Sequence, residues 1–365
     1  MNKKTRLIIL LFCVVCFLVI APILVLYSMG YRLDFEKMEV VATGGIYVRT
    51  FPAAEQIIID SNISEKPGLF SNSIFVQSLL PKNHTVSIKK DGYYDYFKTL
   101  PVQESEVTKL ENVLLFKKNI QFEIIADKTQ SPFDKLEKFI IKNNNLYYSS
   151  SPENANISAD QKLVPILKNL AAFKTINNNI IWLGTDGFLY QSDLTGQTAQ
   201  IQSNATKLVL KSLKIDKNGS YKIISDSQNI FLNNNGELLL LNTKTNSLDN
   251  FYTQVKDAKI SPDGKNIVYF NDKEIRISLL SKQPETKKTL LYKSSENITD
   301  FVWLNNDYII FVSGDKIIIS EIDYRGNINA ITLPQKTDKI FFNQQDNKLY
   351  ILTGGTLLAS EKLTP

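Results

Sequence analysis

The chain has few of the residues on which metal, redox and nucleophilic sites depend. Its 365 residues include one histidine, His84, and two cysteines, Cys13 and Cys16. Both cysteines lie in the N-terminal apolar run, so the rest of the chain has no thiol for a disulfide or a thiolate metal site. In a membrane helix, this Cys-x-x-Cys spacing is more often a pair of small packing residues than a redox pair. We therefore predict no metal site and no cofactor.

The chain also lacks a large excess of either charge sign, and it lacks the common catalytic motifs. The net charge is +5, from 42 basic and 37 acidic residues, and no block of five like charges occurs. This pattern gives no electrostatic support for nucleic-acid binding. No G-x-S-x-G, H-E-x-x-H, Walker or G-x-G-x-x-G motif is present. The sequence therefore predicts a protein that is not an enzyme.

One long apolar segment is present at the N-terminus. The basic stretch "NKKTR" precedes residues 7–29, which carry no charge. As a helix they would span about 34 Å, slightly more than the roughly 30 Å hydrocarbon core of a bilayer. A cleaved signal peptide is the alternative, but the run is too long and lacks a small-residue cleavage site. We favour a transmembrane helix, with residues 1–6 as a cytoplasmic tail and the remainder outside the cytoplasmic membrane.

Beyond this segment the pattern is that of an all-β protein. Short β-rich runs alternate with Asn, Asp, Gly and Pro, which is typical of strands and turns. Residues 135–138 and 162–173 are the modest helix candidates, and we interpret the second as a strand plus a loop. Residues 43–116 contain about seven short strands, enough for a small β-sandwich.

This first β unit resembles a known family. The pattern consists of "GIYV" from Gly45, "FPAA" from Phe51, "IIID" from Ile57 and "LPKNHTVSIKKDGY" from Leu80. It is similar to the PEGA domain, most specifically in the strand that begins at His84. The resemblance implies an immunoglobulin-like module at the cell surface, with no catalytic residues to assign. We expect His84 to hydrogen-bond a turn at the start of its strand.

An aromatic cluster follows that strand. It consists of Tyr93, Tyr94, Tyr96 and Phe97. Strand alternation would place Tyr94 and Tyr96 on one face and Tyr93 and Phe97 on the other. One set is expected to fill the sandwich core, and core packing is the favoured role. The other set could form an exposed platform for a glycan or a partner protein, so these four residues are the candidate partner-binding site.

Residues 119–365 contain a weak internal repeat of about 40 residues, the length of a β-propeller blade. Copies begin at Ala172, Ser212, Asp257, Asp300 and Asp338, with a shorter copy from Lys138. The "ISPDGK" segment at residues 260–265 resembles the turn of TolB-type, WD40-like propellers. Pro262 fixes φ at the entry to this turn, and Gly264 allows a positive φ at its exit. Six copies predict about six blades, and five or seven stay open. We expect residues 120–126 to add a strand to the last blade and close the ring.

Three further features of the repeats are candidates for a site. Asp186, Asp226 and Glu274 could converge in a propeller funnel as glycosidase carboxylates, although turn and surface roles are favoured. Two loops that faintly resemble calcium loops lack the full ligand pattern and are interpreted as hairpin turns. Trp182 and Trp303 occupy similar repeat positions and are expected to pack between blades, with a substrate platform as the alternative.

Together these features predict a bacterial, single-pass membrane protein whose C-terminal domains are extracytoplasmic. We expect a non-enzymatic scaffold or recognition protein of the cell envelope, which binds a protein or a wall polymer through its β domains. An extracytoplasmic carbohydrate-active enzyme is the alternative. A signal-relaying sensor is disfavoured, because the predicted cytoplasmic tail has only about six residues.

Overall fold

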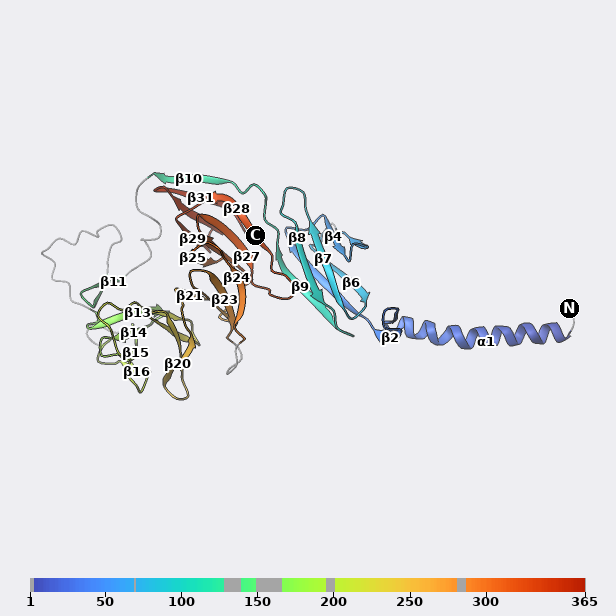
Figure 1. The fold of residues 1–365 in the computed structure, drawn as a ribbon, viewed down its shortest axis with the longest axis horizontal. Helices are drawn as coiled ribbons and strands as arrows, with labels where there is room; N and C mark the ends of the chain where they lie inside the picture. The colour runs from blue at the N-terminus through green and yellow to red at the C-terminus, as the bar shows by residue number, and fades with distance from the viewer. Residues whose placement is uncertain are drawn as a thin grey trace. The chain divides into compact units, whose positions relative to one another are not determined.

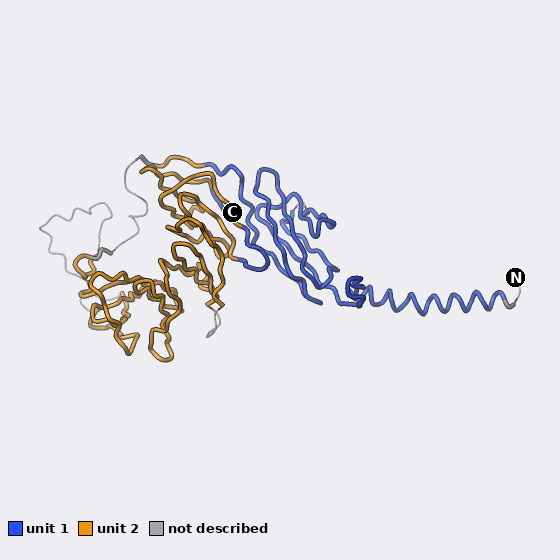
Figure 2. The backbone as a smooth tube through the Cα atoms, viewed as in Figure 1, with its two compact units in different colours: residues 1–121, 323–329, 362–365 blue, residues 122–322, 330–361 orange. Residues whose placement is uncertain are grey.

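The computed structural model describes residues 3–68, 70–127, 139–148, 166–194, 201–280 and 287–364. The helix candidate at 135–138 and the first residues of the one at 162–173 lie outside these ranges. Two compact units are present (Figure 2). The first unit contains Met1–Gln121, Asp323–Asn329 and Lys362–Pro365, and the second contains Phe122–Ile322 and Ala330–Glu361.

The predicted N-terminal helix is present as α1, Lys3–Ser28 (Figure 1). Within Thr5–Ser28, an 18-residue stretch has a mean hydropathy of 3.4 and is not buried against any described part of the protein. A helix that is apolar on all sides needs an apolar environment around it. Its length and composition suit a membrane crossing, either as a single-pass anchor or as a signal sequence.

A short β-hairpin, which was not predicted from the sequence, follows the helix. Its strands are β1 (Tyr31–Asp34) and β2 (Glu39–Ala42), which pair antiparallel. Asp34 fixes the turn between them, because its Oδ1 accepts hydrogen bonds from the amides of Glu36, at 2.9 Å, and Lys37, at 3.4 Å. The base of the hairpin is closed by Thr43, whose amide donates to the carbonyl of Gly30 at 3.0 Å.

Seven strands then form two sheets around one core. The first sheet has the order β6-β3-β9, and the second has the order β5-β4-β7-β8. The strands are β3 (Gly44–Phe51), β4 (Gln56–Ile59), β5 (Ile63–Glu65), β6 (Ser73–Leu79), β7 (Asn83–Lys89), β8 (Tyr96–Pro101) and β9 (Val107–Leu114). Ile46 and Val48 of the first sheet share a buried cluster with Ile57 and Val86 of the second. The alternation of apolar and polar residues places these side chains inside.

The second unit is built from consecutive strands. Its described residues form five four-stranded antiparallel sheets and one two-stranded sheet, β11-β12. The strands outside the last sheet are β11 (Phe139–Lys142), β12 (Asn145–Tyr148), β13 (Leu170–Ile176), β14 (Asn179–Gly184), β15 (Leu189–Asp193), β16 (Thr206–Lys207), β17 (Tyr221–Ser225), β18 (Ile230–Asn234), β19 (Glu237–Asn242), β20 (Ser247–Tyr252), β21 (Asp257–Ile260), β22 (Asn266–Phe270), β23 (Glu274–Leu279), β24 (Thr289–Lys293), β25 (Ile298–Trp303), β26 (Tyr308–Ser313), β27 (Lys316–Glu321) and β28 (Ala330–Lys336). Each sheet corresponds to one predicted repeat.

The last sheet combines strands from both ends of this unit. Its order is β10-β31-β30-β29, from β10 (Phe122–Asp127), β29 (Lys339–Asn343), β30 (Lys348–Thr353) and β31 (Thr356–Lys362). β10 lies alongside β31 as an antiparallel neighbour (Figure 1), which confirms the pairing predicted for residues 120–126. Successive four-stranded sheets of this kind are the repeating element of β-propellers. Apart from α1, the described chain is nearly all β, as predicted.

The turn of the "ISPDGK" segment has the predicted geometry. It joins β21 to β22, and Gly264 adopts a φ of +71°, a conformation that glycine adopts without strain. The Ser261 hydroxyl donates to Asp263 Oδ1 at 2.7 Å, and the Gly264 amide donates to the Ser261 carbonyl at 2.9 Å. Local hydrogen bonds therefore hold this turn.

Candidate functional site

The four aromatic residues do not divide between two faces in the way predicted from the sequence. β8 begins only at Tyr96, so strand alternation does not extend back to the two preceding tyrosines. Tyr96 is buried in the sandwich core, and Tyr93 packs against the same core. Phe97 is 48% exposed, and Tyr94 is half-buried. The expected grouping of Tyr93 with Phe97 on one face is therefore wrong, whereas core packing of Tyr96 is confirmed.

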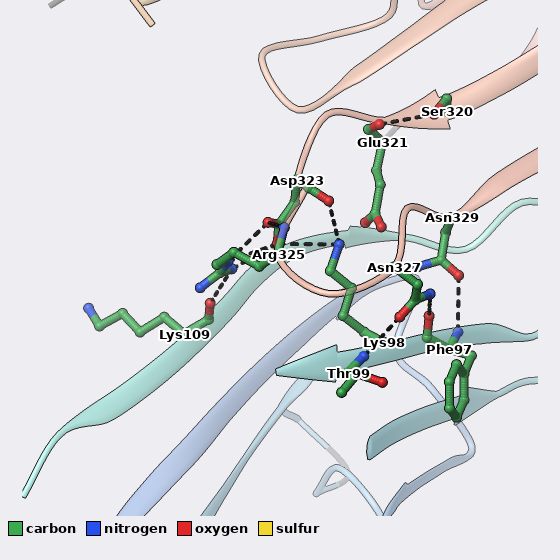
Figure 3. Close-up of polar contacts among 10 residues, drawn as sticks. All are labelled: Phe97, Lys98, Thr99, Lys109, Ser320, Glu321, Asp323, Arg325, Asn327 and Asn329. Atoms are coloured by element: carbon green, nitrogen blue, oxygen red, sulfur yellow. Dashed lines mark hydrogen bonds and ion pairs between the residues drawn. The ribbon is translucent and has the colours of Figure 1, made fainter. Parts of the chain in front are cut away.

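The backbone edge of β8 is covered by side chains from a distant part of the chain. Asn327 donates from Nδ2 to the Phe97 carbonyl at 2.6 Å and accepts from the Thr99 amide at 2.9 Å (Figure 3). Asn329 Oδ1 accepts from the Phe97 amide at 3.2 Å. These amides satisfy the edge as a neighbouring strand would, which protects it from pairing with another chain.

A buried lysine anchors the same segment. Lys98 is fully buried, and its Nζ donates to the Asp323 carbonyl at 2.5 Å and lies 3.7 Å from Asp323 Oδ2. Arg325 contacts Asp323 at 2.8 Å and donates to the Lys109 carbonyl at 3.0 Å (Figure 3). Burial acts to raise the pKa of Asp323, but the Arg325 hydrogen bond and the Lys98 charge outweigh it and lower that pKa. These contacts hold residues 323–329 in the first unit. We call these residues the clasp segment.

His84 has the structural role predicted for it. The ring is buried, with Nδ1 2.5 Å from Asp60 Oδ2 and Nε2 2.7 Å from the Leu80 carbonyl. Burial acts to raise the pKa of Asp60, but hydrogen bonds from the Thr85 amide and from His84 outweigh it and lower that pKa. Both ring nitrogens are occupied by the turn and the neighbouring strand, so His84 holds the start of β7.

A charged cluster in the second unit lies across the first strands of neighbouring sheets. Lys222 on β17 contacts both carboxylate oxygens of Asp257 on β21, at 2.6 and 2.7 Å. Lys259, also on β21, donates to the Phe301 carbonyl on β25. Asp300 on β25 accepts from the Ile340 amide of β29 at 3.4 Å. Four successive sheets therefore meet through these groups.

Burial perturbs two members of this cluster in opposite directions. It raises the pKa of Asp300, although the Lys259 charge partly offsets the effect. It lowers the pKa of Lys259, although Asp300 and Asp257 act against the shift. Burial disfavours the charged form of each group, which explains the opposite signs. A carboxyl group with a raised pKa is one that acid–base chemistry can use.

The charged cluster was not predicted, although the sequence holds a signal for it. Asp257, Asp300 and Asp338 stand at the start of three successive repeats. Asp257 and Asp300 lie on the first strands of neighbouring sheets, and Asp338 directly precedes β29. The repeat pattern alone shows these aspartates as the first residues of repeats and does not show that Asp257 and Asp300 join the same cluster.

The three acids predicted as possible funnel carboxylates have local structural roles. Asp186 accepts from the Phe188 amide at 3.2 Å and the Tyr190 hydroxyl at 2.6 Å. Asp226 accepts from the Asn229 amide at 2.6 Å. The third, Glu274, pairs with Arg276 at 2.9 Å. These contacts confirm the favoured turn and surface roles. Among the described residues, no group of three His, Cys, Asp or Glu side chains could hold a metal ion.

The two tryptophans pack between sheets as predicted, but their expected equivalence in the repeats is wrong, because Trp182 lies on the second strand of its sheet and Trp303 on the first. Trp303 on β25 is buried, and its Nε1 donates to the Lys259 carbonyl on β21 at 3.1 Å. Trp182 on β14 is buried in a cluster that includes Leu146 of β12, and it stacks on Tyr190. Both indoles therefore join neighbouring sheets.

Comparisons with known proteins give only distant likenesses. No protein-family model and no curated protein matches the chain. A solved structure of YCF48 bound to a D1 peptide is similar over 86% of this chain and 94% of that one, with 14% identity and a TM-score of 0.42. A gluconolactonase from Xanthomonas campestris is similar over 55% of this chain and 75% of that one, with 14% identity and a TM-score of 0.36. At TM-scores below 0.5, neither likeness bears on the activity of this chain.

Proposed function

We propose that the protein is a non-enzymatic scaffold or recognition protein of the cell envelope, anchored in the cytoplasmic membrane by α1. Its N-terminus is cytoplasmic, and both β units are extracytoplasmic. The seven-stranded sandwich is a PEGA-like module, and the sheets of the second unit form a propeller of about six blades. The ligand class is an envelope protein or a wall glycan, bound through the β units.

The single observation that carries this proposal is that the polar groups at the candidate catalytic positions already hold strands and turns in place. His84, Asp186, Asp226 and Glu274 are each engaged by nearby strands or turns. Groups that hold turns and strands build a rigid surface, and rigid sheets joined by loops are suited to partner recognition. The exposed apolar helix supports the anchored location, since no described part of the protein covers it.

The test uses the full chain in its own cells. In-cell crosslinking and purification are followed by identification of captured envelope proteins, and the purified chain in lipid nanodiscs is incubated with purified wall glycan. A reproducible partner that is lost when the second unit is deleted is the expected result. Release of shorter sugars from the glycan would contradict the proposal. Protease access to a C-terminal tag in spheroplasts checks the orientation.

One observation favours a second candidate function, the carbohydrate-active enzyme. Burial raises the pKa of Asp300 on β25, and β21, which contacts β25 through Lys259, carries a second carboxylate, Asp257. Glycosidases need one protonated and one ionised carboxyl group. If the chain is such an enzyme, Asp300→Asn abolishes sugar release and Asp186→Asn, at a turn carboxylate, leaves it intact. Equal activity in the two variants would remove the charged cluster from consideration.

A further inference from the structure

The hairpin β1–β2 has two faces of different chemistry. In an antiparallel pair, directly opposed residues point to the same side. Leu33 lies opposite Val40 and Tyr31 lies opposite Ala42, so these four side chains form one apolar face. Leu33 is 42% exposed and Val40 is 55% exposed. The Leu33–Val40 pair of this face is therefore apolar and exposed, whereas Tyr31 and Ala42 are half-buried.

The turn of the hairpin extends this apolar surface. Phe35 is 76% exposed and Met38 is 74% exposed. Met38 also has a φ of +56°, in the left-handed region where glycine or asparagine would be less strained. A large apolar side chain at such a position is unfavourable in water and in the backbone, which indicates a role outside the protein's own core.

The opposite face of the hairpin is turned toward the protein. Arg32 donates to the Ser78 hydroxyl at 3.1 Å. Asp34 and Val41 are both buried. Beside them, Glu36 in the turn pairs with Lys82 at 3.2 Å. Because these contacts occupy the polar face, the apolar face points away from the sandwich.

The hairpin is also fixed to the end of the apolar helix. The Arg32 guanidinium lies 3.5 Å from the centre of the Tyr27 ring, and its Nη1 donates to the Tyr27 carbonyl at 2.8 Å. Tyr27 and Met29 are 59% and 66% exposed. The hairpin is therefore held directly against the end of the exposed apolar helix. Tyrosine and arginine beside a helix end are typical of the membrane interface.

We infer that the apolar face of β1–β2, with Phe35 and Met38, inserts into the outer interface of the same bilayer that α1 crosses. This inference rests on the proposed anchoring by α1. A strand of four residues is about 13 Å long, so the hairpin lies close to the interfacial layer where α1 ends. With the helix, it gives the first unit a second contact with the lipid and restricts its rotation about the anchor.

The experiment measures the depth of nitroxide labels on the full chain in phosphatidylcholine–phosphatidylglycerol vesicles. Cys13→Ala and Cys16→Ala supply a cysteine-free background, in which Phe35→Cys and Met38→Cys are labelled separately. Val19→Cys, within α1, is the reference for the bilayer interior. Lys244→Cys, at an exposed turn of the second unit, is the reference for water. Collision with oxygen and with a water-soluble nickel chelate reports depth.

The expected result is an oxygen-to-nickel collision ratio several-fold higher at positions 35 and 38 than at 244, corresponding to a depth of about 5–10 Å. If both labels behave like position 244 while position 19 is deep, the hairpin inference is wrong and the anchor stands. If position 19 is also accessible to nickel, the proposed anchor fails and the inference falls with it. Low collision with both reagents and spin–spin broadening would indicate a second copy as the occupant, which also overturns the inference.

Discussion

The substitution Gly326→Ala tests whether the clasp segment stabilises the edge of β8. Gly326 has a φ of +63°, and a Cβ atom there would collide with the Thr99 carbonyl oxygen. A backbone atom does not yield as a flexible side chain would, so the clasp segment has to move away. The variant Gly92→Ala is the matched control, because Gly92 has a φ of +75° and its added Cβ would meet nothing within 4 Å.

The expected magnitude follows from the hydrogen bonds that this movement breaks. Both variants place alanine in the left-handed region, which costs roughly 1–2 kcal/mol in each. Gly326→Ala additionally breaks the three hydrogen bonds from Asn327 and Asn329 to β8. At about 1 kcal/mol each, these bonds stabilise the docked segment by roughly 3 kcal/mol. That difference corresponds to an increase of about 100-fold in local opening.

Hydrogen–deuterium exchange on the full chain measures this opening. The reporters are the amides of Phe97 and Thr99, which donate to the clasp asparagines. Exchange at both amides should be fastest in Gly326→Ala and close to wild type in Gly92→Ala. Asn327→Ala, which removes two of the bonds without a clash, should fall between them. Equal exchange in Gly326→Ala and Gly92→Ala would refute the reasoning, because the clash would then have been absorbed without undocking.

Three further outcomes are expected. The pKa of Asp60 is depressed in the folded state, so its carboxylate stabilises the fold above pH 3.8, and this contribution is lost as the pH falls through the folded pKa. The difference in unfolding free energy between wild type and Asp60→Asn, measured by urea titration, should therefore close in acid. A difference independent of pH would argue against the His84 contact. Trp303→Phe leaves the Lys259 carbonyl without its indole donor and should lower the free energy of unfolding by about 1–3 kcal/mol, measured by denaturant titration, with no change counting against the sheet-to-sheet bond. Met38→Asn should leave the free energy of unfolding unchanged or raise it by up to about 1 kcal/mol, because asparagine tolerates the left-handed region; a clear decrease would show that Met38 packs within the protein.

Short-range patterns were sufficient for much of the fold. The length and hydropathy of residues 7–29 predicted α1, and the 40-residue repeat predicted the sheets of the second unit. Alternation predicted the buried residues of β7, and the Ser-Pro-Asp-Gly turn was predicted with its glycine at positive φ. In each case the physical cause acts between residues close in the chain, so the sequence alone determines it.

The aromatic segment marks the limit of that approach. Alternation was extended to residues before the start of β8, but the backbone from Gly92 to Asp95 is not a regular strand, and Tyr93 packs against the core from it. The hairpin β1–β2 was also missed, since its turn contains neither glycine nor proline and depends on an aspartate side chain for its geometry.

The contacts that define the candidate sites were decided by the tertiary structure. Lys98 meets Asp323 across 225 positions of sequence, and Asn327 meets Thr99 across 228. The charged cluster likewise requires Lys222, Asp257 and Asp300 to be brought together from three strands. Local conformational preferences do not predict such long-range contacts, because burial and charge pairing depend on which strands become neighbours in space. The sequence by itself determined most of the elements and their order, and the packing of those elements decided which polar groups are buried, paired and perturbed.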